Sequence, residues 1–400
     1  MTIRPVVLLL VSALVVSCAA PKPATASPSA SASVAPSATA SPSATPASPT
    51  PVPTASARPG IVVTAAGAIP TDAAYVLVQN TGAERVLLID LTAKKSREVV
   101  RFDRPQASRR SVVLSASIDG QTLAILERID ATVLLHVVRP ATGEIRTLPQ
   151  QEGVDGPNIS PEGVNIAVSW TSSDPVLNGL WVLPATGAVG TRIIGEAFGV
   201  PGSPPQARAW SIDGRWLAGF GLGPAVNQIL VVDTRAGSTT YAPATGLAGG
   251  DGRVLSGIDA VWRDSEVITW TLRTATSGPP VMTSYDVQTR ATATLFTAGA
   301  DQTILDAVPR PRSRQVAILV APFSNLTPTM PRTILLAEPG VATRSVRDIA
   351  FVQRIWWSPD GTHLYVRTGG DDSVGSITDV FGTWGTLQFC LRGGDPPACV

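Results

Sequence analysis

The chain has 400 residues, with 31 Lys and Arg against 30 Asp and Glu, so its formal net charge at pH 7 is only +1. A phosphate backbone is bound through a basic surface, and this neutral balance therefore argues against a nucleic-acid partner. Only two histidines, His136 and His363, and three cysteines are present, which leaves little material for a nucleophilic triad or a zinc site. We expect no cofactor, no metal, and a binding module rather than an enzyme.

The first 17 residues have the layout of an export signal. Arg4 supplies the positive start, residues 6–16 form the apolar stretch, and the small Ser17 precedes Cys18. The apolar run has 11 residues, whereas a helix needs roughly 20 to cross a bilayer. The pattern is similar to the bacterial lipoprotein signal, in which the cysteine is lipidated and becomes the new N-terminus. This resemblance implies an exported protein that is lipid-anchored to the bacterial membrane through Cys18 and faces the extracytoplasmic side.

Cysteine usage favours lipidation over two alternatives, an ordinary cleaved secretory signal and an uncleaved membrane helix. If Cys18 carries lipid, Cys390 and Cys399 are left to pair, and no odd thiol remains in an oxidising compartment. A disulfide between Cys390 and Cys399 would close a short loop and contribute about 2–3 kcal/mol in the chain-entropy model. We expect it to hold the C-terminal strand in place.

Residues 18–59 are almost wholly Ala, Ser, Pro and Thr, with Lys22 and Arg58 as the only charges. The repeated prolines forbid a regular helix, and no large apolar side chain offers a core. This composition predicts an extended, disordered tether between the anchor and the domain formed by residues 60–400. A glycosylated stalk or a wall-binding tract is an alternative that the composition does not separate from a spacer.

Residues 60–400 read as short runs rich in Val, Ile, Leu, Trp and Thr, separated by turn residues, which is typical of an all-β domain. A polar turn followed by a strand recurs, and its fullest copy is Trp-Ser-Pro-Asp-Gly at 357–361. Other copies end in Asp119-Gly120, Glu162-Gly163 and Asp213-Gly214, and two eroded copies lie near 262 and 312. The first unit lacks the turn. Equivalent strand positions fall at residues 75, 123, 166, 217, 267, 316 and 364.

Units of about 40–50 residues with four strands predict a β-propeller. The Trp-Ser-Pro-Asp-Gly turn followed by an apolar strand resembles the repeat of TolB-type, WD-like propellers, and the resemblance implies the fold without a function. We predict about seven four-stranded blades, with six or eight as alternatives, preceded by the disordered tether. The Asp-Gly pairs are expected to cap tight turns, and Trp210, Trp262 and Trp357 to fill the space between blades.

Blade geometry then predicts which face binds. The turns between the first and second and between the third and fourth strands are tight, whereas the other connections are long and gather on the opposite face. Long loops on a rigid scaffold usually carry binding residues. The side chains able to recognise a partner there are Asp174, Phe198, Asp251, Arg253, Arg273, Phe323, Asn325, Arg332, Asp371 and Asp372.

The predicted function is that of a binding or scaffold module at the cell envelope, whose partner is an envelope protein or a glycan. The alternative is an envelope hydrolase or lyase that acts on polysaccharide or peptide through carboxylates on the long-loop face. Some peptidases carry a similar propeller ahead of a hydrolase domain, for which we expect no room in this chain.

Overall fold

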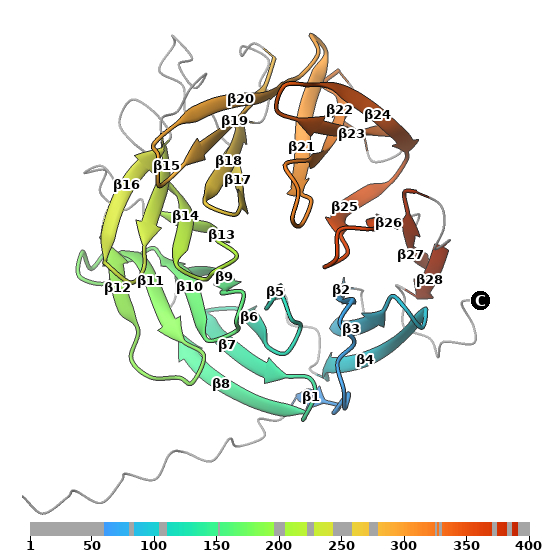
Figure 1. Cartoon of the computed structure of the whole chain (residues 1–400). Coiled ribbons are helices and arrows are strands. Elements are labelled where there is room, and N and C mark those ends of the chain that lie inside the picture. The colour runs from blue at the N-terminus through green and yellow to red at the C-terminus, as the bar shows by residue number, and fades with distance from the viewer. Residues whose placement is uncertain are drawn as a thin grey trace, which may run out of the picture. The chain divides into compact units, whose positions relative to one another are not determined.

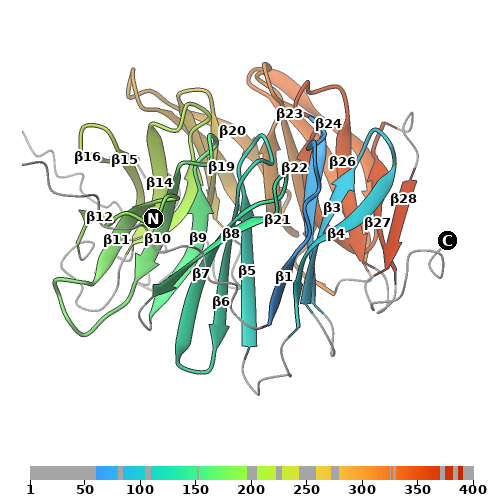
Figure 2. The same cartoon turned by 90° about the horizontal axis from the view of Figure 1, so that it is seen from below.

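The computed structural model describes residues 60–79, 84–103, 110–150, 153–195, 205–221, 228–242, 258–271, 279–324, 326–327, 330–369, 374–381 and 386–390. All of them belong to the unit Pro53–Val400. They form 28 strands in seven four-stranded antiparallel sheets, arranged as the blades of a propeller around a central axis (Figure 1). The predicted all-β fold and the count of seven blades are confirmed. Viewed from the side, the strands run between two faces (Figure 2).

Blades 2–7 share one plan, in which four consecutive strands lie in chain order from the axis outward, as inner, second, third and outer strand. Blade 2 contains β5 Arg110–Ala116, β6 Leu123–Ile129, β7 Thr132–Arg139 and β8 Glu144–Gln150. Blade 3 contains β9 Val154–Ile159, β10 Asn165–Trp170, β11 Gly179–Pro184 and β12 Thr191–Ile194. Blade 4 contains β13 Gln206–Trp210, β14 Trp216–Gly221, β15 Gln228–Asp233 and β16 Ser238–Ala242.

The remaining regular blades follow in the same order. Blade 5 contains β17 Ile258–Arg263, β18 Glu266–Thr271, β19 Val281–Asp286 and β20 Thr292–Thr297. Blade 6 contains β21 Gln302–Pro309, β22 Val316–Pro322, β23 Arg332–Glu338 and β24 Val341–Ile349. Blade 7 contains β25 Val352–Trp357, β26 Leu364–Gly369, β27 Val374–Asp379 and β28 Thr386–Cys390. The seven strand positions of the sequence repeat therefore all fall on second strands or, in blade 1, on β2.

Blade 1 departs from this plan. It contains β2 Ala73–Gln79, β3 Glu84–Asp90, β4 Lys95–Phe102 and β1 Ile61–Val63, in the order β2-β3-β4-β1. The hydroxyl of Tyr75, near the start of β2, donates to the carbonyl of Gly120 in the turn between β5 and β6, at 2.6 Å. Thus β2 starts at the face where inner strands end, and it is a second strand. Among the described residues blade 1 has no inner strand, and β1 pairs instead with the far side of β4.

This order explains why the first unit lacks the Asp-Gly turn, because that turn joins an inner to a second strand. It also corrects the expectation that every unit is a meander of four consecutive strands. Elsewhere the turn has the expected geometry, with Gly120, Gly214 and Gly361 at φ of 67°, 65° and 72°. In the two eroded copies, Asp264 and Arg312 take positive φ themselves, at 48° and 56°.

The core consists of seven apolar clusters, each between two neighbouring blades. Trp210, Trp262 and Trp357, each 7% exposed, lie at or next to the ends of their inner strands and fill the space between blades, as predicted. The indole N–H of each donates to a carbonyl on the inner strand of the preceding blade, at 2.8–3.1 Å. Aromatic packing and a directional hydrogen bond thus fix each of these blades against its neighbour.

Candidate binding surfaces

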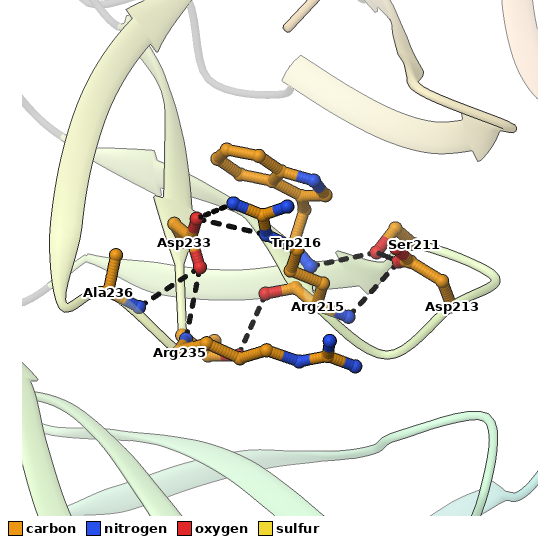
Figure 3. Close-up of polar contacts among 8 residues, drawn as sticks. Ser211, Asp213, Arg215, Trp216, Asp233, Arg235 and Ala236 are labelled. Carbon is orange, nitrogen blue, oxygen red and sulfur yellow. Dashed lines mark hydrogen bonds and ion pairs between the residues drawn. The ribbon is translucent and has the colours of Figure 1, made fainter. Parts of the chain in front are cut away.

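We call the face that carries the inner-to-second and third-to-outer turns the tight-turn face, and the opposite one the long-loop face. Blade 4 shows how the tight turn is built (Figure 3). The Ser211 hydroxyl donates to Asp213 Oδ1 at 2.6 Å, and the same oxygen accepts the backbone N–H of Arg215 at 3.1 Å. The N–H of Trp216 donates to Ser211 Oγ at 2.8 Å. The carboxylate therefore caps the turn, as the sequence predicts.

The same bonds recur in blades 2 and 7. Ser117 and Ser358 donate to Asp119 and Asp360 at 2.6 and 2.5 Å. The Ser358 hydroxyl, followed by the backbone N–H of Thr362, lowers the pKa of Asp360 to about 2, because both bonds stabilise the ionised carboxylate. These aspartates are parts of the turn.

A buried carboxylate, that of Asp233, stabilises the neighbouring turn of blade 4. Asp233 Oδ2 accepts from Nε and Nη2 of Arg215 at 3.0 and 2.6 Å, and Oδ1 accepts the backbone N–H groups of Arg235 and Ala236 (Figure 3). The bond from Arg215 is the largest cause of the lowered pKa of Asp233. The Arg215 guanidinium also lies 4.7 Å from the centroid of the Trp216 ring. This pair joins the two turns of one blade.

On the long-loop face, Asp174 lies in the loop between β10 and β11. Its Oδ1 accepts the N–H of Val176 at 2.8 Å, and its carbonyl accepts the N–H groups of Leu177 and Asn178. The amide oxygen of Asn178 accepts the N–H of Ser172, which closes the loop on itself. Asp174 thus shapes this loop, and the exposed apolar side chain at its tip is Val176, at 66% exposure.

Phe323 lies at the start of the loop between β22 and β23 and is half-buried. Its N–H donates to the carbonyl of Asp301, and the next residue, Ser324, donates both its N–H and its hydroxyl to the Asp301 carboxylate. Leu326 follows at 48% exposure. A second long loop is therefore held by hydrogen bonds to a neighbouring connection and presents an apolar side chain.

Arg332 has a different environment. Its Nη1 donates to the carbonyl of Val352 on the inner strand of blade 7. Burial lowers the pKa of Arg332, because desolvation disfavours the charged form. The side chain joins blades 6 and 7, and a binding role for it stays a prediction. The other predicted binding residues lie outside the described residues: Phe198, Asp251, Arg253, Arg273, Asn325, Asp371 and Asp372.

The same holds for the predicted covalent sites. Cys18 and Cys399 lie outside the described part of the chain. Cys390 ends β28, the outer strand of blade 7, but its side chain is not described. Lipidation and the disulfide stay predictions.

The tight-turn face carries an apolar feature that the sequence reasoning missed. Ile118, Val164 and Ile212 lie in or beside the turns of blades 2, 3 and 4 and are 66%, 53% and 54% exposed. The N–H of Ile118 donates to the carbonyl of Pro161, so the turns of blades 2 and 3 touch. The signal was present in the sequence, since Ile118 and Ile212 stand one residue before the turn aspartate, where Pro359 stands in blade 7.

Each histidine contacts a buried carboxylate of its own blade. In blade 2, His136 Nε2 lies 3.1 Å from Glu127 Oε2, and Nδ1 lies 2.9 Å from Thr147 Oγ1. The side chains of His136 and Glu127 are 1% and 0% exposed, so this row of three residues joins strands inside the blade. His363 precedes β26 and contacts the buried Asp379, with Nδ1 and Oδ2 3.1 Å apart.

The described residues contain no group of three His, Cys, Asp or Glu side chains placed to hold a metal ion. The same residues include no helix long and apolar enough to cross a membrane.

No protein-family model and no curated protein matches the sequence. Among solved structures, the fold resembles a prolyl endopeptidase, at a TM-score of 0.58 and 13% identity over 83% of this chain and 50% of that one. The chain thus spans half the length of that endopeptidase. An oligogalacturonate lyase, solved with manganese, matches at a TM-score of 0.52 and 13% identity, over 83% and 87% of the two chains.

A TolB protein from Agrobacterium tumefaciens matches at 16% identity and a TM-score of 0.48, over 74% of this chain and 99% of that one. Identities this low show a common fold alone. The neighbours therefore include a TolB protein, a peptidase and a lyase on the same architecture, and function has to be argued from the surfaces of this chain.

Proposed function

We propose that this protein is an exported, lipid-anchored β-propeller that binds an envelope protein or glycan through its long-loop face. The anchor is Cys18, supported by the signal-like residues before it. Residues 18–59 serve as the tether between the anchor and the propeller. The seven-bladed fold supplies a rigid platform on which separate loops act together.

The observation that carries the proposal is how the described residues of two long loops are held. Asp174 and Asn178 close loop 171–178, and Phe323 and Ser324, which begin the other loop, donate hydrogen bonds to Asp301. Segments held in this way are pre-organised, and ordering them on binding costs little conformational entropy. Each presents an exposed aliphatic side chain, Val176 or Leu326, and apolar contact area is what a binding surface contributes most.

The test places a photo-crosslinking residue at Val176 or Leu326 in cells that carry the anchored protein. Ile212 and Val341, which are 54% and 60% exposed at the tight-turn face, are the matched control positions. The proposal expects one reproducible partner at Val176 and Leu326 and none at the controls. A partner captured only at Ile212 would move the site to the tight-turn face and refute the long-loop proposal.

The anchor is tested separately. Replacing Cys18 by Ala should leave the signal uncleaved or unlipidated, and the mature chain should lose the mass of the lipid and its detergent-phase partitioning. A chain that keeps its partitioning without Cys18 would contradict the anchor. The alternative, an envelope hydrolase or lyase, predicts turnover in a screen of envelope polysaccharides and peptides that charge removal on the long-loop face abolishes.

A further inference from the structure

The missing inner strand of blade 1 leaves an open sheet edge. β2 ends its sheet and pairs only with β3 among the described strands, whereas each of the six other second strands has an inner strand on its axial side. An open edge presents backbone N–H and C=O groups that a further strand can pair with. Blade 1 therefore offers, toward the axis, the position that an inner strand fills in every other blade.

Part of the side-chain surface of β2 is exposed. Among its described side chains, Val76 and Val78 are buried, while Ala73, Ala74, Tyr75 and Leu77 keep part of their surface.

The neighbouring blade supplies side chains at the same place. Trp356 on β25 packs against the apolar cluster that Val76 and Val78 of β2 form with residues of blades 1 and 7, so it lies at the border with blade 1. Trp356 is half-buried. It is the residue before the last one of its inner strand, and the equivalent residues are Ala209 in blade 4 and Val308 in blade 6. Its large ring occupies part of the space that a neighbouring inner strand fills elsewhere.

Two arginines extend this surface toward the long-loop face. Arg354 lies two residues before Trp356 and shares its side of the strand, and Arg367 is its direct partner across the ladder. Arg354 is exposed. The pKa of Arg367 is lowered mainly by its burial and, to a smaller extent, by the nearby charge of Arg354. A carboxylate placed beside the exposed Arg354 would form a charge-assisted hydrogen bond with its guanidinium.

We propose that the inner edge of β2 binds an extended peptide, which pairs antiparallel with β2 and carries a carboxylate side chain beside Arg354. The mode is strand addition, with the main chain supplying affinity and the arginines supplying selectivity. The peptide completes blade 1 as an inner strand. This site is separate from the long-loop face, so its test can fail while the proposed function stands.

The probe is a fluorescent peptide that copies 256–263, Ser-Gly-Ile-Asp-Ala-Val-Trp-Arg, which includes the inner strand of blade 5. Ala260 packs toward the preceding blade, so an Ala260→Glu version of the peptide aims its carboxylate at blade 7. The full-length protein should bind the Glu version about fivefold more tightly in anisotropy titrations. The Arg354→Glu protein should lose or reverse that preference. Arg312→Glu, an exposed arginine at the tight-turn face, is the control and should keep it.

Hydrogen exchange locates the contact. Amides in Ala73–Gln79 should exchange more slowly when the peptide is bound and quickly when it is absent. Three results would overturn the proposal: no binding by either peptide, binding without protection of β2, or protection of β2 in the protein alone. In that case, dependence on protein concentration would identify a second copy as the occupant, and independence would identify a segment of the same chain.

Discussion

The interface between blades 4 and 5 and the interface between blades 7 and 1 are built from the same repeat but close differently. Between blades 4 and 5, Trp262 is 7% exposed and donates its indole N–H to the carbonyl of Ala209 at 2.9 Å. In blade 1 the described residues form no inner strand that could carry such a tryptophan. Instead Trp356 of blade 7 packs against the apolar cluster that contains Val76 and Val78.

The difference shows which part of the repeat closes each interface. Three interfaces, those between blades 3 and 4, 4 and 5, and 6 and 7, join two inner strands through a buried tryptophan and a directed hydrogen bond. The interface of blades 7 and 1, which we call the seam, relies on second and third strands packed through Ile89, Tyr365 and Ile377. Hydrophobic packing alone is non-directional, so the seam should be the weaker of the two. Four predictions test this comparison.

The largest effect is expected from the tryptophans. Trp262→Ala removes a buried ring and leaves a cavity and an unsatisfied carbonyl, and it should lower the free energy of unfolding by about 3–5 kcal/mol. Trp356→Ala removes a half-buried ring and should cost about 1–2 kcal/mol. Chemical denaturation followed by circular dichroism measures both. Equal losses would mean that the seam is packed as firmly as a regular interface.

Next come two glycines that share positive φ. A Cβ on Gly163 would lie 2.6 Å from Thr122 Oγ1, between the turns of blades 2 and 3, whereas one on Gly237 would meet nothing within 4 Å. Gly237→Ala should cost about 1 kcal/mol from backbone strain alone, and Gly163→Ala about 2–4 kcal/mol. Thermal melts of the two variants give the comparison. If Gly163→Ala lost no more stability than Gly237→Ala, the turns of blades 2 and 3 would not be tightly packed against each other.

A smaller effect separates two arginines. Arg310 Nε donates to the carbonyl of Gly361 at 2.8 Å, and its guanidinium lies 5.1 Å from the centroid of the Trp357 ring, so it joins blades 6 and 7. Arg310→Ala should cost about 1–2 kcal/mol. Arg354→Ala at the seam should cost nothing or stabilise by up to about 0.5 kcal/mol, because it relieves the repulsion with Arg367. A clear loss of stability in Arg354→Ala would show that the seam arginines are structural.

The smallest effect concerns acid. Asp360 has a pKa of about 2 in the folded protein against an ordinary 3.8. Because the folded value is depressed, its contribution is fully present above about pH 3.8 and is lost as the pH falls toward 2. Asp360 is exposed, so Asp360→Asn should cost less than about 1 kcal/mol at pH 6 and almost nothing at pH 2. Melting curves at the two pH values measure it, and a difference that does not change with pH would contradict the assignment.

The fold could be predicted because each regular unit repeats a local signal. The Ser-x-Asp-Gly turn, with its hydroxyl and carboxylate bonds, depends on four adjacent residues and is readable from sequence. The order of blade 1 was not readable, because β1 pairs with β4 across about 40 residues and three residues of Ile and Val carry no register. The contact of Arg332 with blade 7 could not be predicted for a similar reason, because its partner is a backbone carbonyl, which any residue supplies.

The place of β1 also has a mechanical consequence. Any pull on the chain before Ile61 enters the propeller at its outer rim, through a strand of only three residues. Its pairing with β4 is short, and Thr64 adds one further backbone bond, to the carbonyl of Val99. Under tension this segment should detach from β4 first, while the strands β2 to β28 stay folded. Tension applied at the N-terminal end would then be absorbed without opening the ring.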